Sequence, residues 1–208
     1  MATGTDPVTG FALAAGMLLL AGPSLTEATF RGSVVLLLDI DDEGALGVVL
    51  NRPTGAHLGE ATPMADFDGF GPAAGAVRST PVMEGGPVDR TRLLALVEWR
   101  PGWGPRGDRL QQVLPGTGMA DLIGLAESGE GALDPAWESV RIRAYVGYAG
   151  WGPGQLQHEV AEGAWYVLPG EQEDPFSSAP QTLWRQVVAR QPGRLSWLAS
   201  RPADVGRN

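Results

Sequence analysis

Three short apolar runs crowd the first fifty residues of the chain, at 16–21, 33–40 and 45–50. Each run is too short to cross a membrane as a helix, and each has the length and aliphatic content of a buried strand. Turn-forming residues close the runs, and only residues 41–44 separate the second run from the third. We therefore expect these two strands to form a central hairpin in a sheet.

The first run is also similar to the apolar core of a signal peptide. Such a core normally follows a basic residue. Here Asp6 precedes the run, and the first basic residue is Arg31. We therefore interpret the run as a strand, and we expect a cytoplasmic protein without membrane attachment.

Shorter elements are predicted along the rest of the chain. Apolar runs or alternating patterns predict strands at 82–84, 93–99, 140–147 and 165–168. Apolar residues three and four positions apart predict helices at 117–128, 154–162 and 180–191, with a last turn at 195–199. A long connection covers 54–80 and a loop covers 101–108.

The order of these elements favours one α+β domain around a mixed β-sheet with short flanking helices, because the strands cluster and do not alternate strictly with helices. We place this domain at residues 14–200, between a flexible N-terminus of residues 1–13 and a C-terminal tail of residues 201–208. The 30 Gly and 17 Pro residues predict many tight turns.

Composition removes much chemistry. All 15 basic residues are Arg, against 24 acidic residues, so the formal net charge is −9. The chain has no Lys, no Cys and only two His, His57 and His158. A Schiff-base or P-loop Lys, a Cys nucleophile, a thiolate zinc site and a disulfide are therefore excluded. The acidic balance also argues against a nucleic-acid-binding surface, which is normally basic.

Two patterns imitate known motifs without the required context. Residues 39–44 begin like a calcium-binding loop, but the twelfth position is Leu50 where a bidentate Glu is needed. A solvated hairpin turn is favoured instead. Residues 69–74 match a dinucleotide-binding pattern by letter only, because no strand precedes them. We expect no metal and no cofactor.

The ends of two predicted strands carry the first candidate binding residues. Asn51 and Arg52 follow a buried strand, where they could contact an anion or another ligand, or could cap the strand and form an ion pair. Gly85 and Gly86 could form an anion-binding nest of N–H groups. The alternative is a tight turn that places Pro87 at the start of a helical turn, and glycine usually has such a structural role.

A Gly-rich segment, 147–156, carries the remaining candidates, Tyr148, Trp151 and Gln155. A strand is predicted to end in a turn that opens a helix, whose N-terminal N–H groups favour anions. Tyr148 and Trp151 offer flat amphipathic surfaces for a ligand, and the alternative is that both rings fill the core.

A general base would have to come from His158, with Glu159 and Glu162 nearby, or from His57. For both histidines, the interpretation as ordinary surface residues is favoured over catalysis.

These segments, in this order, resemble the YqgE/AlgH family: NRP after the strand GALGVVL, then GGPV, then GYAGWGPGQL. The opening GMLLLAGPSL, Phe30 and Ala164-Trp165 fit the same family, and the resemblance covers about residues 14–200. It implies one α+β domain with a bifurcated sheet folded into a pseudo-barrel, and no established enzymatic activity.

The resemblance also implies features that this chain lacks. The family often has Glu-His where Asp39-Ile40 stands, Leu-His where Leu96-Val97 stands, and Gln-Leu-Glu-x-Glu where residues 155–159 read QLQHE. A mechanism built on the two missing histidines cannot operate here. One branch of the family is linked to regulation of alginate production, but the charge of −9 and the absence of a helix-turn-helix signal weaken a regulator label.

Our leading hypothesis is a cytoplasmic, non-catalytic binding or regulatory protein whose partner is a small anion or a protein. The candidate site residues are expected to converge on one concave surface: Asn51, Arg52, Gly85, Gly86, Tyr148, Trp151 and Gln155. The alternatives are an enzyme that acts on a small anionic substrate, with Arg52 holding the anion and His158 or Glu159 as base, and a transcriptional regulator.

Overall fold

The computed structural model describes residues 11–61, 67–99, 110–129 and 135–192. Its centre is the predicted hairpin of β2 (Val34–Asp41) and β3 (Gly44–Val49), which is confirmed as an antiparallel pair. β1 (Met17–Ala21) pairs with β2, and β10 (Trp165–Pro169) pairs with β1, both antiparallel. The most apolar runs of the sequence thus lie side by side in the sheet. Their strands are buried on both faces, which explains why the runs are apolar without alternation.

The sheet divides at the long strand β9 (Arg141–Trp151). The last residues of β9 pair with β3. Its first half pairs with β6 (Val88–Glu98) along one edge and with β5 (Pro81–Glu84) along the other. The sheet continues through the strands β8 (Thr117–Ala120) and β7 (Leu110–Leu114), while β4 (Pro53–His57) pairs with β5.

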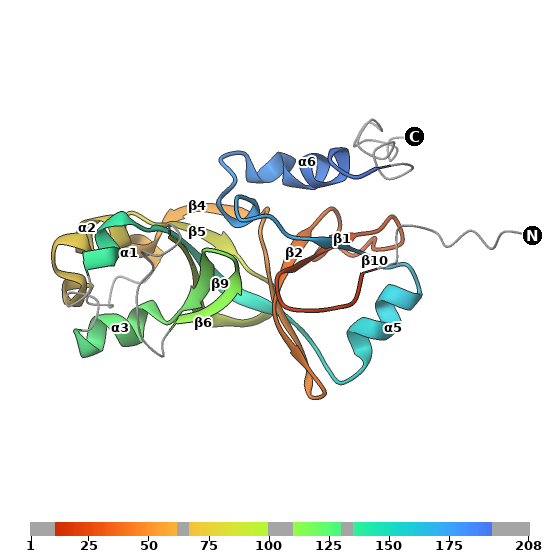
Figure 1. The fold of residues 1–208 in the computed structure, drawn as a ribbon, viewed down its shortest axis with the longest axis horizontal. Coiled ribbons are helices and arrows are strands. Elements are labelled where there is room, and N and C mark those ends of the chain that lie inside the picture. The colour runs from red at the N-terminus through yellow and green to blue at the C-terminus, as the bar shows by residue number, and fades with distance from the viewer. Residues whose placement is uncertain (1–10, 62–66, 100–109, 130–134, 193–208) are drawn as a thin grey trace, which may run out of the picture.

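This arrangement confirms the expected fold class. The sheet is mixed, because β5 and β9 run parallel while the other pairs are antiparallel. It is bifurcated at β9 and curls into a half-barrel, with the two lobes visible at the two ends of Figure 1.

Glycines allow the two branches to meet at β9. The chain crosses one face of β9 between β5 and β6, since these strands lie on opposite edges of β9. A Cβ on Gly85 would overlap the carbonyl oxygen of Gly147, and a Cβ on Gly86 would overlap the Tyr148 carbonyl group. Gly85 also joins both branches: its N–H donates to the Val146 carbonyl, and its carbonyl accepts from the N–H of Val49.

The helices are short and lie around the two lobes (Figure 1). One lobe holds α1 (Leu58–Ala61), α2 (Ala74–Arg78) and α3 (Leu122–Ser128), and the other holds α5 (Gln155–Ala161) and α6 (Leu183–Ala189). Short 3₁₀ segments occupy Asp68–Ala73, which is kinked at Gly71, and Pro135–Ser139, Asp174–Phe176 and Pro180–Thr182.

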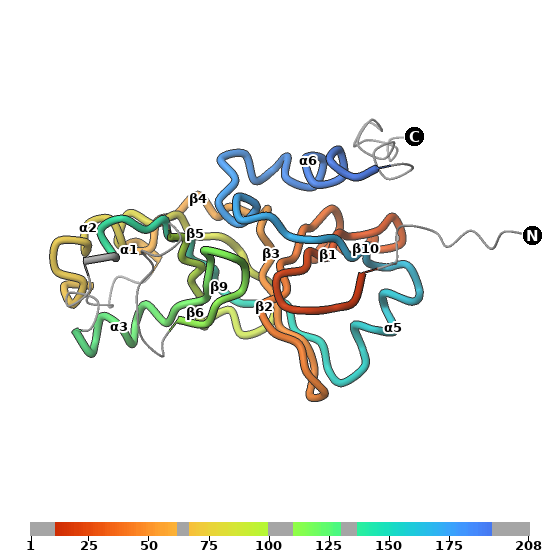
Figure 2. Tube along the Cα trace, in the orientation of Figure 1, coloured from red at the N-terminus to blue at the C-terminus, as the bar shows by residue number. Residues whose placement is uncertain are grey.

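Helices α5 and α6 cover opposite faces of the strands between them (Figure 2). Val187 and Val188 of α6 belong to the same core cluster as Leu18 of β1. Leu156 of α5 belongs to a different cluster with Leu19, the next residue of β1. Because successive strand residues point to opposite faces, these contacts place the two helices on the two sides of the sheet.

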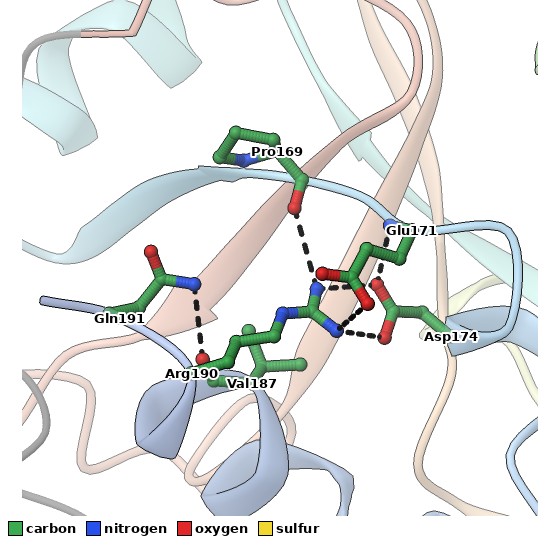
Figure 3. Close-up of polar contacts among 6 residues, drawn as sticks. All are labelled: Pro169, Glu171, Asp174, Val187, Arg190 and Gln191. Atoms are coloured by element: carbon green, nitrogen blue, oxygen red, sulfur yellow. Dashed lines mark hydrogen bonds and ion pairs between the residues drawn. The ribbon is translucent and has the colours of Figure 1, made fainter.

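A partly buried ion pair fastens the end of α6 to the segment that follows β10 (Figure 3). The Arg190 guanidinium makes two hydrogen bonds of 2.7 Å to the Asp174 carboxylate, and it lies 3.1 Å from a Glu171 carboxylate oxygen. Asp174 also accepts from the backbone N–H of Glu171 at 2.7 Å and is only 4% exposed. This geometry holds the C-terminal helix against the sheet.

Three predicted elements differ from the structure. The helix expected at 117–128 is wrong in its first third: residues 117–120 form β8, and α3 begins only after Asp121, whose side chain accepts from the N–H of Gly124. The strand expected at 140–147 continues to Trp151, so the Gly-rich turn comes later than predicted. The connection at 54–80 contains a strand and helices.

Other predicted elements agree with the structure or fall outside it. The helices expected at 154–162 and 180–191 correspond to α5 and to a 3₁₀ turn followed by α6. The loop expected at 101–108, the turn at 195–199 and the tail at 201–208 lie outside the described residues.

Candidate functional site

An open groove of about 440 Å³ lies between the tip of the β2–β3 hairpin and the end of β9. We call it the hairpin groove. Its lining combines apolar and aromatic residues with carboxylates of the hairpin: Asp39, Ile40, Asp41, Glu43, Gly44, Ala45, Leu46, Val88, Tyr148, Gly150 and Trp151. The volume is within the range typical of ligand sites.

The hairpin tip forms the acidic wall of the groove. Asp41 Oδ1 accepts from the backbone N–H groups of Glu43 and Gly44, at 2.8 and 3.1 Å. The interpretation of this segment as a hairpin turn is therefore confirmed. Asp39, Asp41 and Glu43 are exposed, and within the described part of the chain none of these three forms an ion pair.

The floor of the groove is apolar. Val88 is 37% exposed, and Gly150 leaves the ring of Tyr148 uncovered on the groove side. β6 bulges away from β9 here, because Val88 pairs with Tyr148 while the next pair is Leu93 with Val146. The bulge directs Arg92 over the Tyr148 ring, with 6.0 Å between the guanidinium carbon and the ring centroid.

Trp151 lines the groove with one edge, while most of the ring fills the core, as one of its two interpretations expects. Its indole N–H donates to Glu159 Oε2 at 2.9 Å, and the indole N–H of Trp165 donates to the same oxygen at 2.7 Å. Gln155 Nε2 donates to the other carboxylate oxygen at 2.8 Å. Glu159, considered as a base, thus anchors α5 to β9 and β10.

Asn51 and Arg52 lie at the end of β3 that is far from Trp151, which pairs with Ala45. Asn51 accepts from the N–H of Val34 at 3.0 Å and donates to the carbonyl of Gly32 at 2.9 Å, as expected of a residue that caps a strand. Arg52 donates to the carbonyl of Ala28 at 3.0 Å. Neither residue lines the groove.

Gly85 and Gly86 border the groove without lining it. The N–H of Gly85 is used by the Val146 carbonyl, and so it is not open to an anion. The helical turn considered for Pro87 is wrong, because the chain passes directly into β6. The structure therefore brings Gly85 and Gly86 against Tyr148, joins Trp151 to Gln155 through Glu159, and leaves Asn51 and Arg52 apart.

The two histidines lie on the surface, away from the groove. His57 is 3.7 Å from Glu60, and His158 is 3.3 Å from Glu162 on the same helix. Within the residues that the structure describes, no group of three His, Cys, Asp or Glu side chains could hold a metal ion. A search of the same residues found no helix with the length and apolar character needed to span a membrane.

The groove contains residues that the sequence argument did not select. Asp39 and Ile40 belong to the end of the strand predicted at 33–40 and, with Glu43, to the predicted solvated turn, and Val88 appears only as the last residue of the GGPV motif. A signal was present at Asp39-Ile40, where the chain departs from the pattern of the family that it resembles. Val88 had no such signal, because its exposure results from the bulge in β6.

A mixed, bifurcated half-barrel with an open groove beside its central hairpin defines an α+β protein. A family model described as AlgH-like matches residues 18–196. The chain therefore belongs to the AlgH-like family, which confirms the resemblance.

Relatives and solved structures agree with this assignment. The chain is 42% identical over 197 residues to the UPF0301 protein SCO2948 of Streptomyces coelicolor, covering 93% of this chain and 94% of that protein. A UPF0301 protein of Nocardia farcinica is 38% identical over 198 residues, covering 93% and 85%.

Two solved structures share the fold. Protein DIP2367 from Corynebacterium diphtheriae matches with a TM-score of 0.73 at 24% identity, covering 92% of this chain and 94% of that chain. The AlgH protein from Pseudomonas aeruginosa matches with a TM-score of 0.62 at 23% identity, covering 98% and 100%. These names specify no ligand and no reaction, so the function has to be argued from the groove.

Proposed function

We propose that this protein is a non-catalytic binding protein and that the hairpin groove is its binding site. The observation that carries the proposal is an apolar floor at the surface, made by Ile40, Leu46, Val88 and Tyr148, inside a groove of about 440 Å³. Exposed apolar surface in a concavity is typical of sites that bind another molecule.

The openness of the groove favours a segment of a partner protein over a small molecule, because small ligands are usually buried on most sides. The frame is also firmly built: Asp41 fixes the hairpin turn, and Glu159 fixes Trp151. A rigid, preformed surface reduces the entropy lost on binding.

The groove does not favour an enzyme acting on a small anion, nor a regulator that binds nucleic acid. Three carboxylates line it, and they would repel an anionic substrate or a phosphate. Arg52, the residue expected to hold an anion, instead donates to the Ala28 carbonyl outside the groove. A cytoplasmic location remains part of our proposal, supported by the lack of Cys in the chain.

Site-specific photo-crosslinking in the native host tests the proposal. A photoreactive amino acid is placed at Val88, in the groove, or at Gln181, which is exposed beside α6 on another part of the surface. We expect a defined adduct at position 88 and a different, weaker or absent pattern at position 181. The absence of any adduct at 88, or identical adducts at both positions, would overturn the binding function of the groove.

A further inference from the structure

Resting on the proposed binding function, we infer that the hairpin groove receives a segment of a partner protein that carries basic side chains beside an apolar one. The inference combines the apolar floor of the groove with the charge of its rim. The groove is formed by residues far apart in the sequence: residues 39–46 line one side, and residues 88 and 148–151 line the other.

The apolar floor selects the centre of the segment. Val88 is 37% exposed, and it lies beside Tyr148 and opposite Ile40 and Leu46, which are partly buried. Covering these groups with an aliphatic or aromatic side chain removes their remaining apolar surface from water. The absence of a side chain at Gly150 leaves room for the bound segment to approach β9.

The acidic rim selects the flanks of the segment. Asp39, Asp41 and Glu43 line the groove, and Asp42 is exposed at the same turn. Among the residues with a described structure, none of these carboxylates is neutralised by an ion pair. Their combined charge attracts Arg or Lys side chains and repels acidic ones.

The neighbouring cations do not cancel this charge. Arg90 lies 3.5 Å from Glu84, which is outside the groove lining. Arg92 lies over the Tyr148 ring and is not among the residues that line the groove. The groove is therefore acidic along the hairpin, while the β6 side carries arginines. This difference favours basic residues on the side of the bound segment that faces the hairpin.

Fluorescence anisotropy with the full-length protein tests the inference. The probe is a labelled ten-residue peptide of alternating Arg and Leu, and the matched probe has Glu in place of every Arg. The groove variant Asp39→Asn/Glu43→Gln removes two carboxylates and leaves Asp41 to form the turn. The control variant Glu127→Gln/Glu138→Gln removes the same charge from exposed sites outside the groove lining.

We expect the Arg peptide to bind and the Glu peptide not to bind, with affinity that falls as salt is raised. The groove variant should weaken binding by roughly twofold to thirtyfold, from two exposed ion pairs, and the control variant should change it far less. Equal losses in the two variants, or no binding of the Arg peptide, would overturn the inference.

Two further results separate this inference from the proposed function. In the first, the protein binds spermine but not the Arg peptide, and the groove variant Asp39→Asn/Glu43→Gln weakens spermine binding. The ligand would then be a small cation and not a protein segment, which would overturn the inference. A groove-specific adduct at Val88 that the Arg peptide does not compete away would leave the binding function standing and refute the basic partner.

Discussion

Tyr145 provides a sharp test of the structure, because its phenol is completely buried in the middle of β9. Its hydroxyl donates to the carbonyl of Pro175 at 3.4 Å. Burial raises the pKa of the Tyr145 phenol well above its ordinary value, and the positive charge of Arg143 offsets only part of this effect. The folded protein therefore keeps a proton that the unfolded chain loses at about pH 10.

The sign of the effect follows from this difference. Below about pH 10 both states hold the proton, and the contribution of Tyr145 to stability is fully present. As the pH rises further, the unfolded chain releases the proton first, and the free energy of unfolding falls by about 1.4 kcal/mol per pH unit. The chain has no Lys, and Arg keeps its charge, so few other groups titrate in this range.

Urea unfolding of the native protein and of Tyr145→Phe, measured from about pH 8 to about pH 11.5, checks this prediction. At the lower pH the variant should be less stable by about 1 kcal/mol, because it lacks the hydrogen bond to Pro175. The two curves should cross near about pH 11, above which the variant is the more stable protein. A difference that stays constant across this range would refute the reasoning.

Three further substitutions test the frame of the fold. Gly86→Ala should lower the free energy of unfolding by roughly 3 kcal/mol or more, because the new Cβ would overlap the backbone of β9. Gly75 lies in open space on a helix, so the control Gly75→Ala should leave this free energy unchanged or raise it; chemical unfolding measures both. Glu159→Leu should cost roughly 2–4 kcal/mol and change the tryptophan fluorescence, because two indole N–H groups lose their acceptor; unchanged emission would contradict this. Asp174→Ala should cost roughly 1–3 kcal/mol, because Arg190 loses two charged hydrogen bonds and keeps Glu171 as its remaining carboxylate partner, and Asp174→Ala/Arg190→Leu should recover part of the loss in a double-mutant cycle.

The two strands of the central hairpin were predictable because their apolar stretches are buried on both faces. Residues 34–38 and 48–50 are apolar without interruption, and every one of them is buried, so their pattern has no competing explanation. By contrast, residues 117–120 include Met119 at a spacing that also fits the helix that follows. Pairing with β6, a long-range contact, decides that these residues form a strand.

The candidate site was less predictable for the same reason. Aromatic and Gly-rich character identified Tyr148 and Trp151, which do line the groove. The hairpin lies beside Tyr148 and Trp151 because β3 pairs with the last residues of β9, and no local pattern specifies this long-range pairing. The turn alone explains acidic residues at the hairpin tip, because Asp41 accepts hydrogen bonds from the turn N–H groups. The sequence therefore offered no reason to place these residues in a groove with Tyr148.

The glycines of the two central motifs and the groove are consequences of one event in the fold. The chain can cross the face of β9 only where Gly85 and Gly86 meet Gly147, since side chains at the first two positions would overlap the backbone beneath. That crossing brings Val88 to the edge of β9 beside Tyr148, where it forms part of the apolar floor of the groove. The glycines of these motifs therefore act through backbone shape. The motifs also supply Val88, Tyr148 and Trp151 to the groove, whereas its carboxylates come from the hairpin tip outside them. A relative that keeps the glycines of the crossing but has a different charge at residues 39–43 should retain the fold and bind a partner of different charge. Variants of this protein with reversed charge at the hairpin tip can test this directly.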